Sequence, residues 1–172
     1  IAYILENGGE PDRILALTFT KKAAAEMKAR IAAIVGEKKA RRLYMGTFHS
    51  VFIRFLREFA ESLGYPASFT IYDTSDSISA IKSCLKEMKL DDKVYKPKDV
   101  LSRISMAKNN LITPQAYKKD AQAIINDTHA KKPEICNIYA RYAERCRQAG
   151  VMDFDDILLN MNILFRDNPV LS

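Results

Sequence analysis

The sequence predicts an α/β fold that is mostly helical and that combines a parallel pair of strands with an all-helical inserted subdomain. Two short apolar runs, residues 14–19 and 43–48, have the length of buried strands, and a helical pattern follows each of them at once. This strand–helix–strand–helix order favours parallel pairing. After residue 72 the apolar residues recur at helical spacing almost throughout, so we expect the rest of the chain to be helical.

Start and stop signals locate the elements of the first 65 residues. Residues 1–7 are predicted to end a helix, Thr20 to cap the helix that follows the first strand, and Gly36 to end that helix. The helix after the second strand should stop at Gly64. The apolar faces of these two helices are expected to carry Ala24, Met27, Ile31 and Ile34 in the first, and Phe52, Phe55, Leu56, Phe59 and Leu63 in the second.

From residue 66 onward, one short extended piece over residues 69–72 precedes a series of helices. A capping hydroxyl followed by proline, as at Thr113-Pro114, is a strong start signal, and Asp153 can cap the last helix. We expect helices over residues 75–90, 97–110, from 114, over 133–150 and from 154 onward.

These patterns divide the chain into three parts: residues 1–65 with the strand pair, a helical insertion over residues 66–150, and a returning helix over residues 151–172. Because the chain opens at Ile1 in the middle of a helical pattern, we expect it to be a piece of a longer protein.

Composition narrows the classes of protein. The 172 residues carry a formal net charge of +6, which suits contact with nucleic acid but also occurs in many unrelated proteins. No apolar run approaches the ~20 residues that span a bilayer, and no signal peptide is recognisable, so we expect a cytoplasmic protein with no membrane partner.

The cysteines form no CxxC pair, which predicts buried thiols. The histidines form no HExxH motif, so no metal site is predicted. The basic run 38–42 is predicted to be a solvated connection, with contact to a DNA backbone as the alternative.

Hydroxyl, aromatic and basic side chains follow the first strand. The hydroxyls of Thr18 and Thr20 and the charge of Lys22 stand at a helix start, where backbone amides and the helix dipole favour a phosphate. Phe19 offers a face on which a base could stack. In the structural alternative, Phe19 is a core residue, Thr20 is only a cap and the lysines are solvated. Spacing alone favours this alternative.

The second strand ends in a similar group. Gly46 permits close backbone approach, and Thr47, His49 and Ser50 can donate to phosphate, although the same residues also suit a plain strand–helix junction. Because the carboxyl ends of parallel strands share one edge of a sheet, we expect the two loops to lie side by side. No carboxylate is specified that would complete a triad with His49 and Ser50, so no catalytic residue is predicted.

The acidic cluster Asp153-Phe154-Asp155-Asp156 could suggest a magnesium site. The magnesium-binding acid of a Walker B motif follows an apolar strand, whereas this cluster precedes an apolar helix. Capping of that helix is therefore the better explanation. The sequence also contains no GxxxxGK[ST] phosphate loop.

At these same positions the chain resembles the UvrD/PcrA/Rep family of superfamily 1 DNA helicases. Residues 17–27 (LTFTKKAAAEM) are similar to the family's motif Ia, usually TFTNKAAxEM, and residues 46–50 (GTFHS) are similar to motif Ib. Tyr72-Asp73 and residues 150–156 also follow the family's layout. The resemblance implies a partial RecA-like motor domain 1A of the P-loop NTPase type over residues 1–65, and subdomain 1B after it.

The resemblance also implies which residues bind DNA. It implies that the aromatic ring of Phe19 binds a base, and that Thr18, Thr20 and Lys22 contact the DNA backbone. Motif Ib adds Thr47, His49 and Ser50. Lys21 stands where the family usually has asparagine. The lysine keeps the attraction for phosphate, but it lacks the hydrogen-bond donor and acceptor that the amide of asparagine combines.

The activity implied by the resemblance is ATP-driven movement 3′ to 5′ along single-stranded DNA. ATP and Mg²⁺ are then cofactors of the complete protein and not of this chain, because the Walker A lysine should lie before Ile1 and motif II after Ser172. The expected partners are single-stranded DNA, single/double-strand junctions, and repair or replication proteins. The alternative is a non-enzymatic, basic helical module that binds nucleic acid or protein. A nuclease-linked relative of the AddA or RecB type fits less well.

Overall fold

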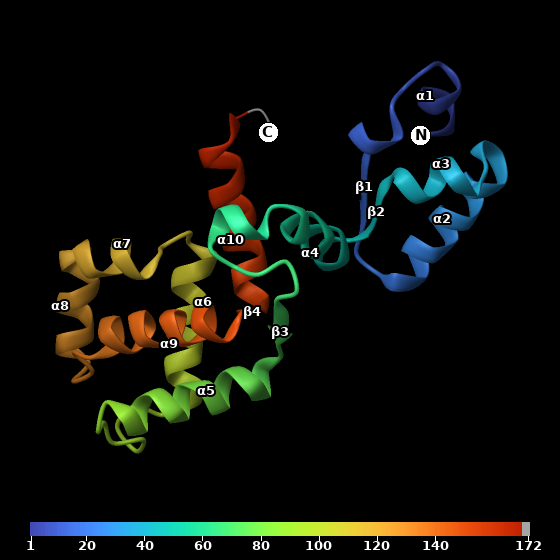
Figure 1. Ribbon diagram of the computed structural model, residues 1–172. Coiled ribbons are helices and arrows are strands. Elements are labelled where there is room, and N and C mark those ends of the chain that lie inside the picture. The colour runs from blue at the N-terminus through green and yellow to red at the C-terminus, as the bar shows by residue number, and fades with distance from the viewer. Residues whose placement is uncertain (170–172) are drawn as a thin grey trace. The chain divides into compact units, whose positions relative to one another are not determined.

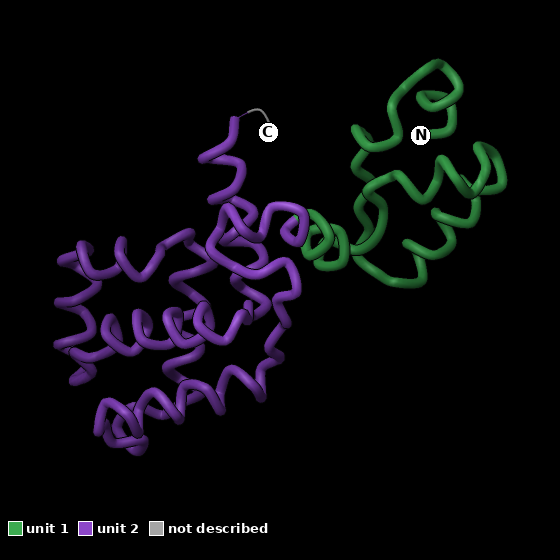
Figure 2. The backbone as a smooth tube through the Cα atoms, in the orientation of Figure 1, with its two compact units in different colours: residues 1–55 green, residues 56–172 purple. Residues whose placement is uncertain are grey.

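The computed structural model describes residues 1–169, and the chain forms two compact units, residues 1–55 and 56–172 (Figure 2). Each unit contains a two-stranded parallel sheet, labelled in Figure 1. The α/β class and the predominance of helix that the sequence predicts are therefore confirmed. The three-part division of the chain stays a prediction, because the compact units are drawn at a different boundary.

The first unit follows the predicted strand–helix–strand–helix order. Strands β1 and β2 pair in parallel, in a register that places Leu15 opposite Tyr44 and Thr18 opposite Thr47. Its elements are α1 (Ala2–Glu6), the short 3₁₀ helix η1 (Pro11–Arg13), β1 (Leu15–Thr18), α2 (Lys21–Val35), α3 (Glu37–Arg42), β2 (Tyr44–Thr47) and α4 (Phe48–Glu58), which continues beyond residue 55.

The core of the first unit corrects two details of the sequence prediction. The buried cluster is Leu5, Ile31, Ala40 and Leu43. Ile34 lies outside it and is 59% exposed, because α2 turns its Ile31 side inward and Val35, four residues further on, follows that face. Leu15 is also exposed, so β1 is not covered on both faces as its apolar run had indicated.

The basic run 38–42 belongs to helix α3, so the prediction of a loop is wrong. Glu37 occupies the first turn, where the positive end of the helix dipole stabilises an acidic side chain. Its carboxylate accepts a hydrogen bond from Arg41, one turn later, at 2.9 Å. Ala40 is buried on the inner face. These local interactions explain why the run is helical despite its charge.

The second unit holds the remaining elements. They are the 3₁₀ helix η2 (Ala60–Leu63), β3 (Thr70–Tyr72), α5 (Thr74–Glu87), α6 (Pro97–Asn109), α7 (Pro114–Lys119), α8 (Ala121–His129), α9 (Ile135–Ala149), β4 (Val151–Asp153) and α10 (Phe154–Asp167). β3 and β4 pair in parallel, with Thr70 opposite Val151 and Tyr72 opposite Asp153. The extended piece at residues 69–72 was predicted, but its partner was not. Residues 66–150 are therefore not all-helical.

Most of the start and stop signals act as the sequence predicts. Thr20 Oγ accepts a hydrogen bond from Ala23 N at 3.1 Å, and Thr113 Oγ accepts one from Ala116 N at 3.2 Å. Gly150 closes α9 in the left-handed region, at φ 65°. The helix expected to reach Gly64 instead ends at Glu58, and a 3₁₀ turn covers the remaining distance.

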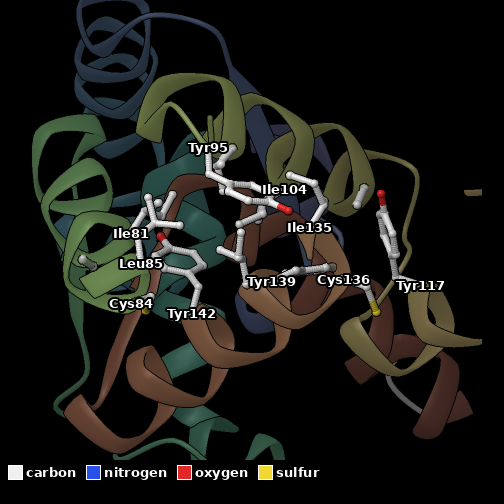
Figure 3. Packing of buried hydrophobic residues seen from close by; sticks show 14 of the residues in the cluster. Ile81, Cys84, Leu85, Tyr95, Ile104, Tyr117, Ile135, Cys136, Tyr139 and Tyr142 are labelled. Carbon is white, nitrogen blue, oxygen red and sulfur yellow. The ribbon is translucent and has the colours of Figure 1, made fainter. Parts of the chain in front are cut away.

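Helices α5, α6 and α9 enclose the main core of the second unit (Figure 3). Tyr139 and Tyr142 of α9 are fully buried among aliphatic side chains of the neighbouring helices. Cys84, Cys136 and Cys146 are buried free thiols, as expected, and burial raises the pKa of Cys146 to about 12. Figure 3 labels Ile81, Cys84, Leu85, Tyr95, Ile104, Tyr117, Ile135, Cys136, Tyr139 and Tyr142.

Candidate nucleic-acid interface

The register of β1 and β2 brings the two predicted loops to one edge of the sheet. Thr18 and Thr47 are paired at the last position of the two strands, and α2 and α4 begin just beyond them. The side-by-side arrangement expected from parallel pairing is thereby confirmed. We call this edge the strand-end rim. It consists of Thr18, Phe19, Thr20, Lys22, Thr47, Phe48, His49 and Ser50.

Two aromatic rings stand on the strand-end rim. Phe19 is 91% exposed, which excludes the core position that spacing alone had favoured. Its ring centroid lies 5.4 Å from that of Phe48, with the ring planes inclined by 45°, and Phe48 is itself 38% exposed. Phe48 in turn makes an edge contact with Phe52 at 5.9 Å. Phe48 lies within the GTFHS segment but was not among the predicted site residues.

The hydroxyls of the first loop hold the strand ends in place. Thr18 Oγ donates toward the carbonyl oxygens of Thr20, at 3.2 Å, and of Gly46 on the neighbouring strand, at 3.4 Å. Thr20 Oγ accepts from the amide of Ala23, so Thr20 is the helix cap that the sequence predicted. Thr18 and Thr20 therefore have structural roles beside any role in binding.

The second loop is also internally bonded. Thr47 Oγ donates to Ser50 Oγ at 2.9 Å, and Ser50 Oγ donates to the carbonyl oxygen of Thr47 at 2.9 Å. A Cβ atom at Gly46 would lie 2.7 Å from Ser50 Oγ and 3.3 Å from Val51 Cγ2. Glycine is thus needed here for the first turn of α4 to approach the strand. His49 is exposed in the same turn.

Charge at the strand-end rim favours an anion. Helices are stabilised by acidic residues in the first turn, yet neither α2 nor α4 has one. Helix α2 begins instead with Lys21 and Lys22, both exposed. The positive end of the helix dipole and two ammonium groups act in the same direction. The two helices that follow the other parallel pair, α5 and α10, do have acidic first turns, at Asp76 and at Asp155 and Asp156.

The acidic cluster at residues 153–156 begins on the last residue of strand β4, so the sequence-based premise that it does not follow a strand is wrong. The predicted role as a helix cap is confirmed. Asp153 accepts from the amide of Asp156 at 2.9 Å, and Asp156 accepts from the amide of Asp153 at 3.0 Å, which makes a reciprocal capping box for α10. Lys108 of α6 is only 2% exposed, and its Nζ lies 2.7 Å from an oxygen of each aspartate. Tyr142 donates to Asp153 at 2.8 Å.

Burial and pairing shift the pKa values of this cluster in opposite directions. Burial alone would lower the pKa of Lys108, but the carboxylates of Asp156 and Asp153 raise it above its ordinary value. Burial raises the pKa of Asp156 to about 6, although Lys108 opposes the effect. For Asp153 burial is outweighed by the charge of Lys108 and its hydrogen bond, so the pKa stays below its ordinary value. Lys108 neutralises only one of two buried carboxylates.

Across residues 1–169, no group of three or more His, Cys, Asp or Glu side chains is arranged to hold a metal ion. The sequence lacks a phosphate loop, and Lys108 already fills the space between Asp153 and Asp156. In the same range, no helix has the length and apolar character required to cross a membrane.

Two parallel strand pairs and a predominance of helix define an α/β protein. Residues 1–172 match the UvrD/REP helicase N-terminal domain, and the chain belongs to this family. The resemblance inferred from residues 17–27 and 46–50 is confirmed.

Named relatives support the same family. The chain is 41% identical over 170 residues to the ATP-dependent DNA helicase PcrA of Staphylococcus epidermidis, covering 98% of this chain and 22% of the relative. It is 38% identical over 170 residues to PcrA of Staphylococcus aureus, with the same two shares. For PcrA of Leuconostoc citreum the identity is 37% over 159 residues, covering 92% and 20%. The chain thus spans about a fifth of the length of these curated relatives.

Proposed function

We propose that this chain is part of an ATP-dependent DNA helicase that moves 3′ to 5′ along single-stranded DNA, and that its strand-end rim holds the strand. The observation that carries the proposal is the exposed ring of Phe19, placed between two helix starts that lack acidic residues. An exposed aromatic ring beside positive charge suits a base and its phosphate. The relatives named PcrA support the same class of activity.

Each residue of the strand-end rim has a role in this proposal. Phe19 stacks on one base without regard to its identity, and Lys22 attracts the adjacent phosphate. Thr20, His49 and the amides of the first turns donate to phosphate oxygens. Thr18, Thr47 and Ser50 also keep the strand-end rim in shape. The Thr18 hydroxyl bonds the neighbouring strand, and the hydroxyls of Thr47 and Ser50 join the end of β2 to the start of α4.

ATP and Mg²⁺ belong, in this proposal, to parts of the complete protein beyond these 172 residues. The hydrolysis reaction supplies the free energy for movement. The contribution of this chain is to bind the strand and to keep it oriented. Residues 1–65 correspond to part of a RecA-like motor domain, residues 66–150 to a helical insertion, and residues 151–172 to the return toward the motor domain. Partners would be single/double-strand junctions and proteins of repair or replication in the cytoplasm.

The experiment is Phe19→Ala in the complete protein that contains this chain. Affinity for labelled oligothymidylate and oligoadenylate, measured by fluorescence anisotropy, should fall by about 1–3 kcal/mol for both strands. Tyr3→Ala is the matched control, because Tyr3 is 77% exposed in the same unit but belongs to α1, away from the rim. Wild-type binding by Phe19→Ala would contradict the proposal.

Direction and ATP dependence are tested with the same protein. On a strand that carries streptavidin at one end, movement 3′ to 5′ displaces the block from the 5′ end and not from the 3′ end. Displacement should require ATP. Binding of single strands without any ATP-dependent displacement would favour the alternative, a non-enzymatic module that binds nucleic acid.

A further inference from the structure

The ring of Phe48 explains how an exposed side chain such as Phe19 can have a defined orientation. We infer that Phe48 is a positioning residue for single-strand binding, which acts by holding the ring of Phe19 where a base can stack on it. This inference rests on the proposed function and deepens it. The resemblance assigned DNA contacts to Thr47, His49 and Ser50, and no role to the aromatic residue among them.

The strand register creates this ring pair. Because Thr18 and Thr47 are direct partners in the parallel sheet, Phe19 and Phe48 each stand one residue beyond a paired position. Their ring centroids come to 5.4 Å, inside the 4.5–7 Å range typical of stabilising aromatic pairs, and the planes are tilted by 45°. A change of register by one residue would separate the two rings.

The ring of Phe48 is better anchored than that of Phe19. Phe48 is the first residue of α4, and its ring makes an edge contact with Phe52, one helical turn further on, at 5.9 Å and 79°. Phe52 is itself half-buried. The hydrogen bonds between Thr47 and Ser50 fix the backbone on either side of Phe48. The three rings therefore form a series that leads from the helix surface to the exposed ring.

In this inference, the contact with Phe48 restricts the motion of the Phe19 ring and leaves the ring accessible. Phe19 stays 91% exposed beside Phe48, so almost the whole ring remains accessible to a base. A side chain that is free to rotate loses conformational entropy when a ligand immobilises it, and a side chain already held in place loses less. Phe48 should therefore raise the affinity for a single strand even where it makes no contact with the strand.

The test is a double-mutant cycle in the complete protein, with the wild type, Phe48→Leu, Phe19→Ala and the double variant. Labelled oligothymidylate at a fixed salt concentration is the probe. With Phe19 present, Phe48→Leu should weaken binding about two- to tenfold, the range expected for one immobilised side chain. In the Phe19→Ala background the same substitution should have no effect, because the ring that Phe48 holds is gone.

Two further variants separate positioning from a general effect on α4. Phe48→Tyr keeps the aromatic face and should bind like the wild type. Phe55→Leu removes a ring from the same helix, two turns further along, where Phe55 lies against Tyr44 at 5.8 Å, and it should also bind like the wild type.

The outcomes distinguish this inference from the proposed function. If Phe19→Ala weakens binding but Phe48→Leu does not, or if Phe48→Leu weakens binding equally in both backgrounds, the positioning role is overturned and the proposed function stands. If Phe19→Ala binds like the wild type, the proposed function itself fails. Loss of binding in Phe48→Leu that appears only with Phe19, and recovery in Phe48→Tyr, would support the inference.

Discussion

Lys108 and Asp153 form a buried ion pair, with 2.7 Å between Nζ and the carboxylate oxygen, that joins helix α6 to the end of strand β4. Asp156 lies at the same distance from the same ammonium. One lysine of α6 thus binds both aspartates at the start of α10. Removing it would leave two buried carboxylates without a counter-charge.

Lys108→Met should therefore destabilise the chain. Leaving a buried charge without its partner typically costs about 3–5 kcal/mol. Urea unfolding followed by circular dichroism measures the change in the free energy of unfolding. Lys98→Met, an exposed lysine on the same helix, is the control and should change it by less than about 0.5 kcal/mol. Adding Asp156→Asn to Lys108→Met should restore part of the loss; equal stability of Lys108→Met and the wild type would show that the ion pairs contribute nothing.

Asp156 predicts a dependence of stability on pH. Its pKa is raised from 3.8 to about 6 by folding, so between these values the folded chain keeps a proton that the unfolded chain has lost. The free energy of unfolding should then fall as the pH rises through this window. Compared with Asp156→Asn, the wild type should lose about 1–3 kcal/mol between about pH 4 and about pH 7. Asp155→Asn, whose carboxylate accepts from Asn109, should follow the wild type; parallel curves for wild type and Asp156→Asn would contradict the shift.

Lys22 predicts a change in salt dependence. If Lys22 neutralises one phosphate of a single strand, Lys22→Gln should reduce the slope of log K against log salt concentration by about 0.7. Binding titrations of oligothymidylate with the complete protein, over a series of potassium chloride concentrations, give the slope. Lys28→Gln, an exposed lysine two turns further along α2, should leave it unchanged. An unchanged slope in Lys22→Gln would remove Lys22 from the strand-end rim's contacts.

Residues 1–172 by themselves should not hydrolyse ATP. The sequence contains no GxxxxGK[ST] phosphate loop, the motif that holds the phosphates of ATP in this class of protein. The measurement is phosphate release from ATP by the purified 172-residue chain, with and without single-stranded DNA. A rate that increases with the concentration of the chain, and that copurifies with it, would contradict this expectation.

Local signals in the sequence predicted most of the helix boundaries. Thr20, Thr113 and Asp153 are caps in the structure because the side chain of each bonds an amide only three residues away, and such a bond depends on little else. Parallel pairing of β1 and β2 was predictable because only a short helical crossover, formed by α2 and α3, separates the two strands in the sequence. The pairing of β3 with β4 was not, because five helices lie between these three-residue strands in the sequence.

In the candidate site, too, features that depend on contacts between distant residues could not be predicted from spacing alone. The two loops could be found from residue type, and the resemblance to motif Ia implied a base-binding role for Phe19. Spacing alone predicted neither the exposure of Phe19 nor its contact with Phe48, because an aromatic residue at a strand end also suits a core. Lys108 looks like any surface lysine until the fold brings two aspartates to it. Whether the strand-end rim binds DNA stays a prediction.

The parallel pairing of β3 with β4 also has a consequence for the order of folding. β3 ends at Tyr72 and its partner begins only at Val151, so this sheet cannot form until the whole intervening helical segment has been synthesised. Contacts between residues so distant in sequence form slowly, whereas β1, α2 and β2 can assemble from a continuous stretch of chain. On the ribosome, the first unit should therefore be folded while the second still waits for its last strand.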